Sequence, residues 1–179
     1  MGYDKKLWQE AVAFHGHSCP GLAIGFRAAV LALEKLGVDR AEDEELVAIV
    51  ETDACSVDAI QVIAGCSIGK GNLLYKNHGK QAFTIGNRKT GRGVRVYVDP
   101  SQLPVDRDDR EARREMILSA PAEDFCKIEN VSLPLPEEAR IFLSVECESC
   151  GEKLSEARAR LEDGKIVCLA CFHDYQRGW

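Results

Sequence analysis

Two pairs of cysteines near the C-terminal end constrain the fold of this chain more than any other feature. Each pair has the spacing C-x2-C, and seventeen residues separate Cys147 and Cys150 from Cys168 and Cys171. Two such pairs can place four thiolates around one tetrahedral zinc ion, with Zn–S distances of about 2.3 Å. Because four protein ligands leave no open coordination position, the spacing predicts a structural zinc site.

The residues around these pairs predict a zinc finger of the treble-clef or ribbon type. Gly151 permits the positive φ of a tight knuckle, and Asp163-Gly164 is typical of a two-residue hairpin turn. We expect the second cysteine pair to begin a short helix. Two disulfides or a redox-active C-x2-C are the alternatives. The first residues show no apolar secretory segment, so the expected compartment is the cytoplasm, where thiols stay reduced.

Length and composition indicate one medium-sized domain with a small appendage. Of 179 residues, 45% are hydrophobic and 29% are charged, so we predict a core domain over 1–145 and the finger over 146–179. The longest apolar stretch, residues 21–33, is interrupted by Arg27 and is shorter than the ~20 residues of a membrane helix. Because the net charge is −6 and the finger has no basic excess, nucleic acid is a disfavoured partner.

Apolar periodicity predicts an α+β fold in which helices pack on a mixed sheet. Pro20 suits the first turn of a buried helix and Gly37 its end, which places Cys19 near the N-cap. The expected helices cover residues 5–14, 20–36, 56–64 and 106–118, and the expected strands cover residues 46–52, 81–86, 93–98 and 140–145.

Histidines and cysteines also concentrate in two segments outside the finger. His17 and Cys19 precede the helix at residue 20, and Cys55 precedes the helix at residue 56. A helix N-terminus stabilises negative charge, so both thiols suit metal binding or catalysis. We predict a cleft in which His17, Cys19 and Cys55 bind a transition metal, with one coordination position open. The ligand types suit Zn, Ni, Cu or Fe and do not decide among them.

Other residues near these segments have weaker assignments. We expect His15 to be a hydrogen-bonding partner behind the ligands, and Cys66 and Cys126 to be buried apolar side chains. The Gly-rich segment 65–72 has only three residues between its glycines before Lys70 and no hydroxyl after it, which argues against a Walker loop. Lys70 could still hold an anion beside backbone N–H groups, and a plain turn is the alternative.

Taken together, the segments 14–21, 53–61 and 65–73 and the terminal finger resemble the FmdE family, named for a component of formylmethanofuran dehydrogenase. The resemblance covers nearly the whole chain and implies an α+β core, an auxiliary treble-clef finger and a homodimer. It also implies that His17, Cys19 and Cys55 form a metal-binding active site, with Asp53, Cys66 and Lys70 nearby. The name points to molybdenum or tungsten enzymes that reduce CO2 onto a one-carbon carrier.

The sequence does not resemble the pterin-binding component of those enzymes or an iron–sulfur ferredoxin, so the chain is not expected to perform that reaction alone. The leading hypothesis is a metal-dependent accessory or enzymatic component of such redox metabolism. In it, Asp53 orients a ligand or acts as a base, and Lys70 contacts a small anionic ligand. The alternatives are a zinc-finger module that docks on a larger redox complex and a thiol switch among Cys19, Cys55 and Cys66.

Overall fold

The computed structural model of this protein describes residues 3–132, 134–175 and 177, and it divides into two units, 1–139 and 140–179. This division falls a few residues before the expected domain boundary between 145 and 146. The expected boundary stays a prediction. Each unit is described by itself. None of the described helices combines the length and apolarity that a membrane crossing requires.

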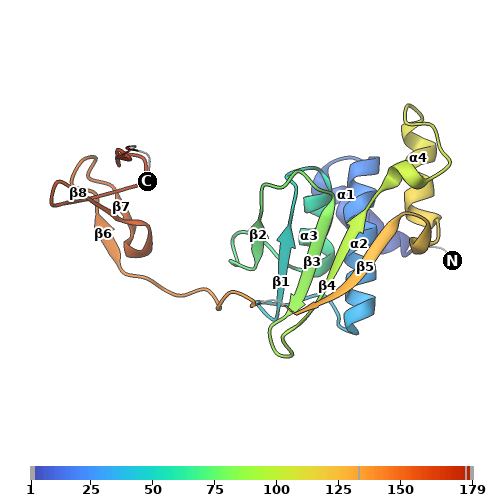
Figure 1. Cartoon of the computed structure of the whole chain (residues 1–179), viewed down its shortest axis with the longest axis horizontal. Helices are drawn as coiled ribbons and strands as arrows, with labels where there is room; N and C mark the ends of the chain where they lie inside the picture. The colour runs from blue at the N-terminus through green and yellow to red at the C-terminus, as the bar shows by residue number, and fades with distance from the viewer. Residues whose placement is uncertain (1–2, 133, 176, 178–179) are drawn as a thin grey trace. The chain divides into compact units, whose positions relative to one another are not determined.

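The described part of the first unit contains a five-stranded sheet with helices on one face (Figure 1). The strand order is β2-β1-β3-β4-β5, with β2 parallel to β1 and the other neighbours antiparallel, so the predicted mixed sheet is confirmed. The helices are α1 (Lys5–His15), α2 (Pro20–Leu36), α3 (Ser56–Ala64) and α4 (Arg110–Ser119), with 3-10 turns at Pro100–Gln102 and Ala122–Asp124. The strands are β1 (Leu46–Val50), β2 (Leu73–Tyr75), β3 (Ala82–Asn87), β4 (Arg92–Val98) and β5 (Cys126–Ser132).

Helix α2 is the central element of the core, as its apolar sequence predicts. Pro20 lies in its first turn, the Cys19 sulfur accepts from the Leu22 N–H at 3.3 Å, and Gly37 ends the helix at φ 67°. The helix packs on strands β3 and β4 and on helix α3. Its contact with α3 is so close at Gly25 that an added Cβ would lie 2.6 Å from the Ser56 carbonyl carbon. This approach holds the start of α3 against α2.

Two strands of the sheet do not follow from the sequence pattern. Strand β5 has exposed Lys127, Asn130 and Ser132 and otherwise only half-buried residues, so it lacks the strict alternation that predicts a strand. It forms because it pairs with β4 along its whole length. Strand β2 is only three residues long and is held parallel to the buried strand β1.

The second unit consists of two small hairpins. Strand β6 (Ser144–Glu146) pairs with β7 (Lys153–Ser155), and β8 (Arg160–Glu162) pairs with β9 (Lys165–Val167); a 3-10 turn covers Glu156–Arg158. The turn Asp163-Gly164 has φ 49° and 79°, which confirms the predicted hairpin turn. The strand expected over 140–145 is wrong in extent, because regular pairing begins only at Ser144. Within the described part of this unit, only Cys147 and Val167 are buried.

The helix expected at the second cysteine pair is also absent from the described residues. Instead, the chain turns at Cys168, whose carbonyl accepts from the N–H groups of Cys171 and Phe172 at 3.1 and 2.9 Å. Both cysteine pairs therefore form turns, and the first turn has the positive φ predicted at Gly151, which is 76°.

Candidate metal centres

The four cysteines of the second unit converge on one point. The sulfur atoms of Cys147, Cys150, Cys168 and Cys171 all lie within 4.8 Å of one another. The Cys147 sulfur accepts from the Cys168 N–H at 3.2 Å, and the backbone N–H groups of Cys150 and Cys168 lower the pKa of the Cys147 thiol to about 6. A stabilised thiolate among three further thiols fits a tetrahedral zinc ion, as the spacing predicts.

A second group of metal-ligating side chains lies in the turn between α1 and α2. The side chains of His15, His17 and Cys19 each offer a ligand atom, and these atoms lie within 4.8 Å of one another. Helix α1 ends at His15, and Gly16 follows at φ 89°, which turns the chain back toward the start of α2. The two imidazole rings lie 4.4 Å apart between centroids. The structure therefore brings His15, which we expected behind the ligands, into the group itself.

A carboxylate of helix α3 orients His15. Asp58 Oδ2 lies 2.7 Å from His15 Nδ1, and Gln61 donates to Asp58 Oδ1 at 3.3 Å. If Nδ1 carries the proton, the lone pair of His15 Nε2 is free on the side of Cys19, whose sulfur lies 3.8 Å away. Metal-binding histidines commonly have such a carboxylate partner. Sequence reasoning missed Asp58, although it lies just after Cys55 in the same helix start.

Cys55 lies beside this group but is not one of its members. A Cβ placed at Gly21 would lie 3.6 Å from the Cys55 sulfur and 3.8 Å from the Cys19 sulfur, so both thiols lie at the start of α2. The Cys55 side chain does not cap α3. Burial and the neighbouring Cys19 raise the pKa of the Cys55 thiol. This is opposite to the expectation that the start of the helix would stabilise a thiolate. Without a metal, Cys55 is thus a thiol at neutral pH.

A cavity of about 530 Å³ opens next to His15 and Cys55. Asp53 and Asp58 line it together with apolar side chains and Tyr75. Asp53, which we expected near the site, is exposed there and forms no hydrogen bond or ion pair with another described residue. This cavity gives a small molecule access to the proposed ligands.

Lys70 lies away from this cavity. Its Nζ donates to the carbonyl oxygens of Glu42 and Asp43, each at 3.2 Å, and it lines a different cavity with Arg40 and Phe14. The structure does not bring Lys70 to the predicted site, and its role there stays a prediction. Its hydrogen bonds are those of a side chain that anchors a turn.

Cys66 and Cys126 pack in or against the hydrophobic core, as apolar side chains do. Cys66 has no exposed surface and Cys126 is half-buried. Burial raises the pKa of Cys66 to about 11 and that of Cys126 to about 12, so both remain unreactive thiols at neutral pH.

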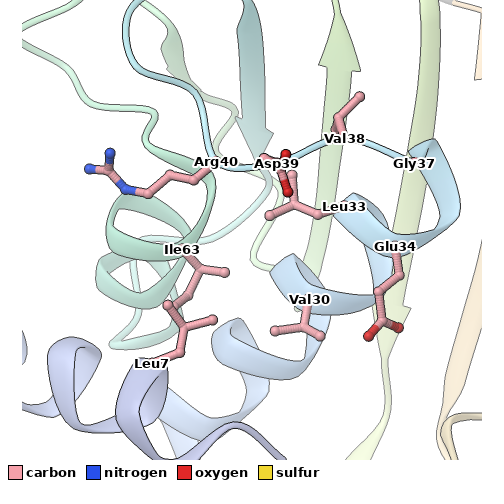
Figure 2. A pocket seen from close by; sticks show the side chains of 9 residues that line it. All are labelled: Leu7, Val30, Leu33, Glu34, Gly37, Val38, Asp39, Arg40 and Ile63. Carbon is pink, nitrogen blue, oxygen red and sulfur yellow. The ribbon is translucent and has the colours of Figure 1, made fainter.

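Another cavity, of about 440 Å³, lies between α1, α2 and α3 (Figure 2). Leu7, Val30, Leu33 and Ile63 supply apolar walls, and charged side chains including Asp39 and Arg40 complete its lining. None of the described residues around it is a cysteine or a histidine. The described walls of this cavity therefore offer no cysteine or histidine ligand to a metal ion.

Comparison with known families and proteins agrees with this arrangement. Residues 14–132 match the family model described as FmdE, Molybdenum formylmethanofuran dehydrogenase operon, and residues 140–177 match that of the prokaryotic dksA/traR C4-type zinc finger. The crystal structure of a tungsten formylmethanofuran dehydrogenase FmdE-like protein from Syntrophus aciditrophicus is similar with a TM-score of 0.70 and 27% identity. The similarity covers 93% of this chain and 90% of that one.

A curated relative from Archaeoglobus fulgidus carries the name Probable S-adenosyl-L-methionine-binding protein. It is 36% identical over 200 residues, which cover 95% of this chain and 53% of the relative. The chain thus spans about half the length of that relative.

Proposed function

Since this chain belongs to the FmdE family, we propose that it is a metal-binding accessory or enzymatic component of formylmethanofuran dehydrogenase-type redox metabolism. In this proposal the core domain, residues 1–145, holds a transition metal, and the finger, residues 146–179, holds a structural zinc. The observation that carries the core site is the convergence of His15, His17 and Cys19 within 4.8 Å.

The donor set suits a borderline or soft metal ion. Two imidazoles and one thiolate would hold zinc, nickel or iron, and Cys55 lies outside this set at the start of α2. When bound, such an ion supplies a Lewis acid that polarises a substrate oxygen or lowers the pKa of bound water. Asp58 fixes the orientation of the His15 ring, and Asp53 can accept or hold a proton at its carboxylate in the adjacent cavity.

The test is the metal content of the full chain purified without oxygen. We expect two equivalents, one of which is lost in a Cys147→Ser, Cys150→Ser variant and the other in a His15→Ala, Cys19→Ala variant. Cobalt substitution separates the sites by spectrum, because an all-thiolate site and a mixed histidine–thiolate site give different ligand-field bands. A single equivalent that disappears completely with the finger cysteines would refute the core site.

A second candidate function is docking by the finger on a larger redox complex. It is supported by the apolar side chains that the second unit exposes, among them Leu161 and Leu169, which are 72% and 51% exposed. It predicts that Leu161→Ser with Leu169→Ser abolishes partner capture, while Cys19→Ala with Cys55→Ala leaves it intact. The reverse result assigns partner binding to the core. Light scattering of the same preparations tests the expected homodimer.

A further inference from the structure

We propose that the cavity beside the core metal group binds an organic cation with an apolar body, and not an anion. The inference rests on the proposed function, because it names the ligand class of the same site. It replaces the anionic ligand that Lys70 suggested, since Lys70 lines another cavity and donates to two backbone carbonyls.

The shape and lining of the cavity indicate an organic ligand. Its volume of about 530 Å³ lies in the range of small-molecule sites. Val57, Ile68 and Leu73 supply apolar walls, and Tyr75 contributes an aromatic ring that is 48% exposed. A ligand with an apolar body would cover Ile68 and Tyr75, both of which are otherwise open to water.

The charges around the cavity favour a cation. Asp53 and Asp58 both line it, and no lysine or arginine is found among the described residues of its walls. A divalent ion bound by the Cys19 thiolate and the two imidazoles would keep one positive charge, and the two carboxylates outweigh it. Asp58 is engaged by His15 and Gln61, whereas Asp53 has no partner among the described residues. Asp53 is therefore the carboxylate available to the ligand, and Tyr75 in the lining supplies an aromatic ring for a cation–π contact.

Three probes of similar size and different charge test this inference on the metal-loaded full chain. They are benzyltrimethylammonium, benzyl alcohol and benzoate, and titration calorimetry measures their binding. We expect the cation to bind about tenfold more tightly than the alcohol, and benzoate to bind least well. Asp53→Asn should weaken the cation about tenfold and leave the alcohol unchanged. Asp39→Asn is the matched control, because it removes the same charge at the other cavity (Figure 2).

Several results would overturn the inference. Benzoate binding as tightly as the cation would show that charge at the metal, not the carboxylates, selects the ligand. If Asp53→Asn and Asp39→Asn weakened cation binding equally, the net charge of the protein and not the position of Asp53 would explain the affinity. If the cation did not bind at all, the proposed cation site would be refuted. Metal analysis of the same samples keeps the two proposals apart. A missing core metal refutes the proposed function, while cation binding that depends on Asp53 would still support the cavity.

Discussion

The contact between α2 and α3 leads to a quantitative prediction for Gly25→Ala. In a helix interior, alanine is usually favoured over glycine by about 1 kcal/mol. Here the added Cβ would lie 2.6 Å from the Ser56 carbonyl carbon and 2.7 Å from its Cα, whereas ordinary contacts begin at 3.4 Å. The Ser56 carbonyl oxygen is nearer still, so the two helices would have to separate by more than 0.8 Å (3.4 minus 2.6), because backbone atoms cannot rotate away as a side chain can.

We set the cost of this separation near 3 kcal/mol, the upper part of the range for overpacked cores. After the gain in helix propensity, a net loss of about 2 kcal/mol in the free energy of unfolding remains. With an m-value of about 2 kcal/mol/M, the urea midpoint of the core should fall by about 1 M. Because Ser56 follows Cys55, the same shift should weaken the core metal site and leave the finger zinc in place.

Urea titration followed by circular dichroism measures the midpoint, and metal analysis follows the core site. Gly69→Ala is the control, since no atom lies within 4 Å of its added Cβ and its φ is not positive. We expect this control to change stability by less than about 0.5 kcal/mol. If Gly25→Ala matched or exceeded the natural chain in stability, the close packing of α2 on α3 would not hold in solution.

Three further predictions test other contacts. Asp58→Asn should lower core metal affinity about 10- to 100-fold in chelator competition, because it disturbs the carboxylate on His15; unchanged affinity would make Asp58 irrelevant to the metal. Glu51→Gln should cost about 1–2 kcal/mol at pH 7, since Glu51 accepts from Arg95 at 2.7 Å and that bond lowers the pKa of Glu51. A lowered carboxylate pKa contributes stability above about pH 4.5 that is lost on acidification. The denaturation midpoints of the natural chain and of Glu51→Gln should therefore converge below that pH. Cys147→Ser should unfold residues 140–179 and leave the helical circular dichroism of the core unchanged. If the helical signal were lost as well, the two units would not be independent.

Local sequence signals predicted many elements because their causes are local. Pro20 and Gly37 bound α2 through their own backbone preferences, and Asp163-Gly164 turns a hairpin for the same reason. Strand β5 escaped prediction because its stability comes from pairing with β4, which no short window of sequence contains. The helix expected at Cys168 failed because the chain forms a turn there, in which its carbonyl accepts two N–H groups.

The two candidate metal sites differ in how far the sequence predicts them. The sequence alone determined the finger site, since the C-x2-C spacing brings each pair together within one turn. It also identified the segments that hold His17, Cys19 and Cys55. Only the tertiary structure decided that Asp58 orients His15, because these residues lie 43 positions apart and meet through the packing of α1 on α3.

Tertiary structure likewise decided the character of the cavity. In the folded chain Lys70 donates to the Glu42 and Asp43 carbonyls, whereas Asp53 lines the cavity beside Cys55. Bond geometry limits what neighbours in sequence can do together, so spacing alone can specify a zinc knuckle. The charge that surrounds a ligand comes from elements far apart in the chain, and only their packing determines it.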